Sequence, residues 1–148
     1  ISGAKNWYET EKRIQGFKSA TEESKLDGSL IWEGDWSAQS GYNATKKIVK
    51  NRKITAIFAG NDAMALGSLK ALNEAGLQVP RDVSLVGFDD LPESQYLTPA
   101  LTTARQDFHE VGEQALLILF GLINNRKSRM NVAIKPEILI RESTAKAR

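Results

Sequence analysis

The sequence predicts an α/β fold in which helices flank a parallel sheet. Short apolar runs alternate with longer segments of helical periodicity along the 148 residues, and this alternation is typical of parallel strands connected by helices. Two of the runs, residues 55–59 and 83–88, are apolar almost without interruption, as strands buried on both faces of a sheet usually are. No repeat, low-complexity stretch or linker divides the chain. We therefore expect one domain over residues 1–148.

The first elements are two helices separated by a strand. Residues 7–24 have helical spacing and place Ile14 and Phe17 on one apolar face. Residues 29–33 contain Leu-Ile-Trp and predict a strand. Residues 37–51 return to helical spacing and predict the second helix.

The second half of the chain repeats this order with clear helix caps. Asn61 is a favourable N-cap residue, and the helix that it opens ends at Gly76, a residue suited to the left-handed turn after a helix. Asp107 and Glu110 have the spacing of a capping box. The other predicted elements are a loop over residues 89–100, a short strand over 101–105, a helix over 107–124 and extended segments over 132–142.

The composition restricts the class of protein. The 20 basic and 18 acidic side chains are interspersed and give a net charge of +2, whereas a nucleic-acid footprint needs basic residues gathered on one face. No apolar run reaches the ~18 residues of a membrane span, and the lack of cysteine excludes disulfides and thiolate metal sites. Because the chain opens at Ile1 rather than Met, we expect a piece of a longer cytoplasmic protein, without cofactor, metal ion or membrane contact.

Distinctive side chains follow the predicted strands at the points where the strands end. Trp36, Asn61, Asp89 and Gln106 each come shortly after a strand. In an open parallel sheet, ligands bind beyond the carboxyl ends of the strands. Arg13, in the second turn of the first helix, is placed to reach the same edge. We therefore expect these side chains to converge on one site.

The chemistry of these side chains suits a sugar. An aromatic face stacks on the C–H face of a sugar ring, and planar carboxylate, amide and guanidinium groups form paired hydrogen bonds with hydroxyls. Taken singly, Asn61 is also explained as a helix cap and Asp89 as a turn former. Their convergence with an aromatic residue favours a ligand site.

Catalysis is not expected. His109 lies at the start of a helix without a nucleophile motif nearby, and no phosphate-binding loop, dinucleotide fingerprint, nucleophile elbow or metal-spaced cluster occurs. The pairs Asn61-Asp62 and Asp89-Asp90 suggest a magnesium or phospho-acceptor site, but the paired acids at the first strand and the lysine at the last strand are not in place. An enzyme of nucleoside or sugar metabolism is therefore the least favoured interpretation.

Several motifs along the chain form a recognisable set. They are Thr-Ala-Ile-Phe-Ala-Gly-Asn-Asp-Ala-Met-Ala-Leu-Gly at 55–67, Val-Pro-Arg-Asp-Val-Ser-Leu-Val-Gly-Phe-Asp-Asp at 79–90, Pro-Ala-Leu-Thr-Thr at 99–103, Gly-Asp-Trp-Ser-Ala at 34–38 and Ile-Arg-Glu-Ser-Thr at 140–144. Together they resemble the lactose-repressor (LacI/GalR) family of bacterial transcription regulators over essentially the whole chain.

This resemblance implies one lobe of a two-lobed effector domain that is similar to periplasmic sugar-binding proteins. The chain would be the second lobe, with residues 107–124 as the crossover helix under the first lobe. Operator DNA would be bound through an N-terminal helix-turn-helix domain outside this chain. The implied effector-binding residues are Arg13, Trp36, Asn61, Asp89 and Gln106, with Phe108 as an apolar wall and Trp7 and Glu9 at positions that vary among relatives.

Glu9 bears on the kind of effector. A carboxylate at this position adds an acceptor for hydroxyls and disfavours an anionic or phosphorylated ligand, so a neutral sugar is favoured. The identity of the sugar, and its action as inducer or corepressor, stay open. A periplasmic sugar-binding receptor of a transport system is the alternative; the motif at 79–90 favours the regulator, and a signal peptide upstream would favour the receptor.

Two apolar surfaces predict contacts with other chains. The helix over 61–76 has one stripe for the core (Ala65, Leu69, Leu72) and a second apolar face of small residues. The resemblance implies a homodimer contact there, with residues Ala63, Met64, Leu66, Gly67 and Tyr96. The helix over 107–124 is apolar nearly all round, and we expect a second copy of this chain to cover it where the first lobe is absent.

Overall fold

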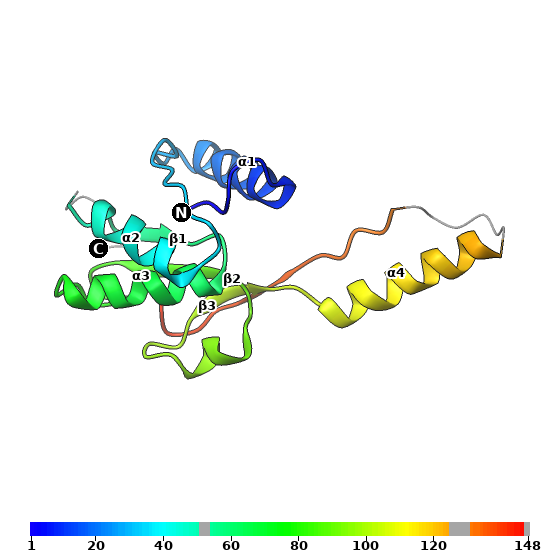
Figure 1. Cartoon of the computed structure of the whole chain (residues 1–148). Helices are drawn as coiled ribbons and strands as arrows, with labels where there is room; N and C mark the ends of the chain where they lie inside the picture. Colours follow the sequence, from blue (N-terminus) through cyan, green and yellow to red (C-terminus); the bar gives the residue numbers. More distant parts are fainter. Residues whose placement is uncertain (51–53, 125–130, 147–148) are drawn as a thin grey trace.

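The elements of the computed structural model follow the predicted alternation (Figure 1). The structure describes residues 1–50, 54–124 and 131–146. In chain order the elements are α1 (Tyr8–Glu23), α2 (Ala38–Ile48), β1 (Ala56–Phe58), α3 (Asp62–Glu74), β2 (Ser84–Asp89), the 3₁₀ helix η1 (Pro92–Tyr96), β3 (Thr102–Arg105), α4 (Phe108–Ile123) and β4 (Glu137–Leu139). The predicted α/β class is confirmed.

The described strands form a sheet in the order β1-β2-β3-β4. β1, β2 and β3 are parallel, with Phe58 paired to Val86 and Val86 paired to Thr102. β4 is antiparallel to β3, because the extended segment after α4 runs back along β3 (Figure 1). The carboxyl ends of β1, β2 and β3 therefore meet at one edge of the sheet, as the sequence predicts.

The predicted strand over residues 29–33 is reduced to a single bridge. Ser2 and Glu33 form an isolated parallel bridge, with hydrogen bonds from the Ser2 amide to Trp32 O (2.8 Å) and from the Gly34 amide to Ser2 O (3.0 Å). The expectation of a strand of five residues is wrong in extent. Of this segment only Glu33 has a bridging partner, Ser2, among the described residues, so residues 29–32 are not assigned to a strand.

Helices α2 and α3 pack closely through glycines. A Cβ atom at Gly67 would lie 1.8 Å from the Ala38 carbonyl oxygen, and one at Gly41 would lie 2.1 Å from the Met64 carbonyl oxygen. Thr45 and Ser68 form a buried hydrogen bond of 2.9 Å across the same interface. The small residues of α3 therefore let α2 approach within the same chain.

This packing corrects part of the predicted dimer surface. Met64 is fully buried and Gly67 is also buried, so neither is available to a partner chain. The second apolar face of α3 is covered by α2, an alternative that the helical spacing alone did not distinguish from a dimer contact. Ala63 is half-buried, and Leu66 and Tyr96 are exposed.

The core stripe of α3 is placed as predicted. Ala65, Leu69 and Leu72 belong to the buried cluster, which also contains Ile57 from β1 and Leu85 from β2. This packing holds the start of α3 and the end of β1 against the sheet, and both elements supply residues to the candidate site.

Helix α4 projects away from the rest of the molecule (Figure 1). It has no buried residue, and its large apolar side chains are exposed, among them Leu116 at 68% and Phe120 at 69%. None of the helices in the described part of the chain is both long and apolar enough to cross a membrane. Among the described residues, the apolar surface of α4 is thus left uncovered.

Candidate functional site

Asp89 is the centre of the polar cluster at the carboxyl edge of the sheet. It closes β2 with a positive φ of 110°, a conformation that is strained for a residue with a Cβ and is concentrated at functional sites. Its Oδ1 atom accepts hydrogen bonds from Arg13 Nη2 at 3.3 Å and from Gln106 Nε2 at 2.7 Å. In the described residues no protein donor bonds to Oδ2, so one carboxylate oxygen is left for a ligand.

Arg13 reaches this cluster from the second turn of α1. Its Nη1 atom donates to the Gly60 carbonyl oxygen, just beyond β1. Its guanidinium carbon lies 4.0 Å from the ring centroid of Phe88 and 5.2 Å from that of Trp36. Guanidinium groups are attracted to aromatic faces at such distances. The side chain is thereby held between two rings while it binds Asp89.

Burial shifts the pKa of both groups in this ion pair. The side chains of Arg13 and Asp89 are only 17% and 21% exposed. Desolvation lowers the pKa of Arg13, against the attraction of Asp89 and Glu9. Desolvation likewise raises the pKa of Asp89, although Arg13 and Gln106 favour its charged form. The carboxylate is therefore less strongly solvated than a surface group and is a stronger acceptor for a ligand hydroxyl.

Asn61 caps α3 and fixes the loop that bears Trp36. Its Oδ1 accepts from the Met64 amide at 2.8 Å, and its Nδ2 donates to the Trp36 carbonyl oxygen at 3.0 Å. Asn61 therefore has the structural role of an N-cap, which the sequence left open beside a ligand role. Its contact with an effector stays a prediction.

Trp36 is held in a restricted conformation beside the chain's first residues. Its φ is 73°, and a Cβ atom at Gly3 would lie 2.0 Å from Trp36 Cζ2, so only glycine fits beneath the indole. Trp36 Nε1 is buried and has no hydrogen-bond partner in the part of the chain that the structure describes. The ring of Trp7 is 6.2 Å from that of Trp36, with 58° between the planes.

Trp7 and Glu9 border the cluster at the start of α1. Trp7 is at the N-cap position and is 55% exposed. Glu9 is in the first turn and attracts the charge of Arg13. An open hollow of about 580 Å³ is lined by Glu9 and Arg13 from α1, with Phe88 and Gln106 from the sheet edge. This volume is within the range of small-molecule sites.

Phe108 does not join the cluster in this arrangement. It is the first residue of the projecting helix α4 and is 60% exposed. None of the described ring contacts or side-chain hydrogen bonds connects it to Arg13, Trp36 or Asp89. Its role as an apolar wall stays a prediction.

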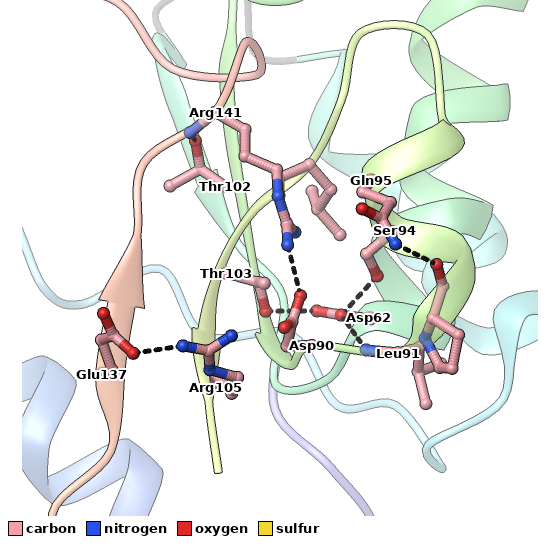
Figure 2. A network of polar contacts seen from close by, with 12 residues as sticks. Asp62, Asp90, Leu91, Ser94, Gln95, Thr102, Thr103, Arg105, Glu137 and Arg141 are labelled. Carbon is pink, nitrogen blue, oxygen red and sulfur yellow. Dashed lines mark hydrogen bonds and ion pairs between the residues drawn. The ribbon is translucent and has the colours of Figure 1, made fainter. Parts of the chain in front are cut away.

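A second polar network surrounds Asp62 (Figure 2), whose charge also acts to raise the pKa of Asp89. Asp62 Oδ1 accepts from Thr103 Oγ1 at 2.6 Å, and Oδ2 accepts from Ser94 Oγ at 2.5 Å and from the Leu91 amide at 2.9 Å. Asp62 is 2% exposed, and a Cβ atom at Gly87 would lie 2.2 Å from its Oδ1. The carboxylate thus ties α3, β3 and the loop after β2 together.

An ion pair extends this network to the C-terminal segment. Arg141 Nη2 donates to Asp90 Oδ1 at 2.6 Å (Figure 2). Arg141 Nη1 donates to the Leu101 carbonyl oxygen at 2.9 Å. Asp90, like Asp89, has a positive φ. The strained Asp89-Asp90 turn is therefore anchored on both sides, by Arg13 and by Arg141.

Sequence reasoning missed several residues that build the site. Phe88 and Gly60 support Arg13, and Asp62 supports the turn that contains Asp89. Neighbouring residues of a strand point to opposite faces, but the sequence does not say which face α1 covers, so Phe88 could not be assigned to Arg13. The burial of Asp62 had no clear local signal, because an acidic residue in the first turn of a helix is favourable at the surface as well.

The described residues contain no group of three or more His, Asp or Glu side chains arranged to hold a metal ion. The paired acids Asp89 and Asp90 are turned to different partners, Arg13 and Arg141. The cluster offers hydrogen-bond donors and acceptors to a polar ligand.

Comparison with known proteins gives a consistent result. Residues 1–144 match the model of the periplasmic binding protein-like domain. The chain is 40% identical over 137 residues to the HTH-type transcriptional repressor PurR of Escherichia coli O1:K1, and 38% identical to PurR of Proteus mirabilis. Each alignment covers 90% of this chain and 40% of the relative. The chain therefore spans less than half the length of these relatives.

Solved structures show the same fold. The Lac repressor dimer bound to operator and the anti-inducer ONPF has a TM-score of 0.93 at 31% identity, over 98% of this chain and 51% of that one. A complex of the transcriptional regulator CelR with cellobiose has a TM-score of 0.88 at 27% identity, over 97% of this chain and 45% of that one. In each case, this chain aligns with about half of the other.

Proposed function

Because the chain belongs to the periplasmic binding protein-like domain family, among the LacI-type transcription regulators, we propose that it is the effector-binding and dimerisation lobe of a sugar-responsive repressor. The single observation that supports the site is the cluster around the Arg13–Asp89 pair. Gln106 also donates to Asp89, and the rings of Trp36 and Phe88 flank the Arg13 guanidinium. The repressors among the named relatives support a regulator rather than a transport receptor.

The proposed effector is a neutral sugar. Asp89 Oδ2 accepts a ligand hydroxyl, the indoles of Trp7 and Trp36 supply apolar faces, and Glu9 adds a second acceptor at the rim. Two carboxylates beside one guanidinium disfavour an anionic ligand, because the added negative charge meets like charge in a partly desolvated site. The presence of cellobiose in the CelR complex is consistent with this class of ligand.

The proposed response couples this site to DNA through the relative position of two lobes. The sugar binds between this lobe and the first lobe, and the change in their orientation alters how the DNA-binding domains of a dimer meet the operator. Such coupling requires two distinct sites and a difference in affinity between two states. The Asp62 network connects the effector edge with the loop that ends at Tyr96, and this loop lies on the proposed dimer surface.

The dimer surface proposed for this lobe is centred on exposed residues. Leu66 on α3 is 46% exposed and Tyr96 on η1 is 80% exposed, and Ala63 borders them. Met64 and Gly67 are excluded from this surface because α2 covers them. The proposed partner is a second copy of the same lobe.

The experiment that tests the site uses the protein at the full length of its relatives. Operator binding is followed by fluorescence anisotropy against a panel of neutral hexoses and disaccharides, their phosphorylated forms and free nucleobases. We expect a neutral sugar to change operator affinity, and Asp89→Ala or Arg13→Ala to abolish that response while operator binding persists. Lys18→Ala, an exposed position on α1, is the matched control.

Two results would count against the proposal. An unaltered sugar response in both Asp89→Ala and Arg13→Ala removes the assigned pocket. A response to a nucleobase or to a phosphorylated sugar alone removes the neutral-sugar assignment.

Glu9→Gln tests the rim directly, because we expect it to weaken discrimination against phosphorylated sugars without loss of operator binding.

A further inference from the structure

The turn after β2 has an unusual backbone conformation at two successive residues. Asp89 has a φ of 110° and Asp90 has a φ of 58°, in the half of the backbone map that residues with a Cβ atom rarely occupy. Such a conformation costs free energy and persists only where surrounding contacts enforce it. Asp89 also supplies the central carboxylate of the candidate site. The contacts that hold the turn therefore decide where this carboxylate lies.

The contacts of the Asp89 side chain belong to the candidate site itself. Its hydrogen-bond donors are Arg13 and Gln106, and both donors line the open hollow of about 580 Å³. A ligand that bonds to these two side chains competes with Asp89 for the same N–H groups. The turn therefore needs a support that lies outside the hollow.

Asp90 has such a support in Arg141. Asp90 Oδ1 accepts a hydrogen bond from Arg141 Nη2 at 2.6 Å, and the two side chains are only 13% and 20% exposed. Among the described residues, Arg141 is the only hydrogen-bond and ion-pair partner of the Asp90 side chain. A buried carboxylate without its partner is strongly destabilised. Neither residue lines the hollow, so this ion pair is independent of a bound ligand.

Arg141 is itself fixed in direction. Its backbone amide donates to Thr102 Oγ1 at 2.9 Å, and its Nη1 donates to the Leu101 carbonyl oxygen at 2.9 Å. A guanidinium group holds its donors in a rigid planar fork, so the bond to Leu101 sets the direction of the bond to Asp90. Figure 2 shows the guanidinium pointing at the Asp90 carboxylate. Arg141 therefore links the start of β3 to the turn that follows β2.

We propose that Arg141 is a positioning residue of the effector site. By holding Asp90, Arg141 keeps Asp89 in the strained conformation in which its carboxylate joins the polar cluster. Arg141 acts through the backbone of the two aspartates and touches no ligand. Its role in effector binding rests on the proposed function, whereas its role in the geometry of the turn does not. Effector affinity then depends on a residue of the segment that follows β4.

The first test needs no ligand. Crystal structures of the effector-free protein, at the full length of its relatives, are compared for the wild type and for Arg141→Gln. In the variant we expect the φ of Asp89 to leave the positive region and its bond to Gln106 to break. Hydrogen exchange of residues 89–91, followed by mass spectrometry, should accelerate about tenfold.

The second test measures effector affinity by calorimetry, with glucose and cellobiose as probes. We expect Arg141→Gln to weaken binding about tenfold, because relaxation of a strained residue moves the carboxylate, while operator binding without sugar persists. Arg141→Lys retains the charge but not the fork, and it should restore part of the affinity. Asp90→Asn should also weaken binding, and the double variant should lose no more than the weaker single variant, because both changes act through one contact.

Two control variants loosen the same part of the chain without a contact to the turn. Glu137→Gln removes the exposed ion pair with Arg105 between β4 and β3. Thr144→Val removes the 3.0 Å hydrogen bond between the hydroxyls of Thr102 and Thr144. Both variants should leave the sugar affinity and the exchange of residues 89–91 within about twofold of the wild type.

The outcomes separate positioning from a merely structural role. An unchanged φ of Asp89 and unchanged exchange in Arg141→Gln overturn the proposal, and so does a loss of affinity in Thr144→Val as large as in Arg141→Gln. If Arg141→Gln does not fold, the isosteric Asp90→Asn undergoes the same structure and exchange tests. Absence of binding of either sugar to the wild type counts against the proposed effector, and the ligand-free measurements then still decide the role of Arg141.

Discussion

Arg13 and Asp89 are 76 positions apart in the chain and meet at 3.3 Å. Arg13 comes from the second turn of the first helix and Asp89 from the last residue of β2. The contact closes α1 over the carboxyl edge of the sheet, and the same guanidinium bonds to the Gly60 carbonyl oxygen. The effector cluster and the packing of α1 on the sheet edge therefore both depend on the Arg13 side chain.

The Arg13–Asp89 pair should contribute to stability as a coupled unit. Because both side chains are about four fifths buried, removal of one partner leaves a desolvated charge, and we expect Arg13→Met or Asp89→Asn to lower the free energy of unfolding by about 3 kcal/mol. The double variant should lose about 1–2 kcal/mol less than the sum. Urea unfolding of the four proteins measures this, and strictly additive losses would contradict the pair.

Asp62 should contribute strongly to the stability of the fold, although we do not propose that it contacts the effector. Its carboxylate accepts three hydrogen bonds in a buried position, so we expect Asp62→Asn to cost about 2–4 kcal/mol. Hydrogen exchange of the Leu91 amide should accelerate in this variant. Asp27→Asn, at an exposed carboxylate bonded to the Ser29 amide, is the control and should change stability little.

Replacement of Gly67 in α3 and of Gly16 in α1 by alanine should change the stability of the protein in opposite directions. A Cβ atom at Gly67 would collide with the Ala38 carbonyl oxygen at 1.8 Å, and backbone must move to admit it, so Gly67→Ala should destabilise by about 1–3 kcal/mol. Gly16 in α1 has open space around it, and Gly16→Ala should stabilise by about 0.5–1 kcal/mol. Thermal melting of both variants is the measurement, and two shifts of the same sign would refute the packing described.

The exposed face of α4 should cause self-association of this chain. Leu116 and Phe120 are among its large exposed apolar residues, and apolar patches of this kind mark interaction sites. We expect sedimentation velocity to show dimers or larger species as concentration increases, and Leu116→Glu with Phe120→Glu to restore the monomer. Leu26→Glu, also exposed, is the control. A monomer at every concentration would remove the hypothesis that a second copy covers α4.

The predicted elements and the observed ones agree where local signals are strong. The caps at Asn61 and Asp107 form side-chain hydrogen bonds to the Met64 and Glu110 amides, and Gly76 has a positive φ of 72°. These features depend on residues within a few positions of each other, so the sequence shows them directly. The strand over residues 29–33 was overestimated because its extent depends on a partner strand distant in the chain.

The candidate site was predicted in composition but not in geometry. The strand-end rule selected Trp36, Asn61, Asp89 and Gln106, and the structure brings Arg13 into contact with two of them. The strand-end rule did not predict that the Asn61 side chain is engaged as a helix cap, or that the Phe88 ring packs on the Arg13 guanidinium. The orientation of each side chain depends on neighbouring residues from other helices and strands. A single sequence does not show which residues these neighbours are.

The sequence by itself determined the alternation of strands and helices, the helix ends and the set of polar residues at one edge of the sheet. Only the tertiary structure decided that the small-residue face of α3 is covered by α2 and that Asp62 is buried. The physical reason is the range of the interactions. Helix caps and apolar periodicity act over a few residues, whereas close packing, buried hydrogen bonds and strand pairing depend on which distant segments the folded chain brings together.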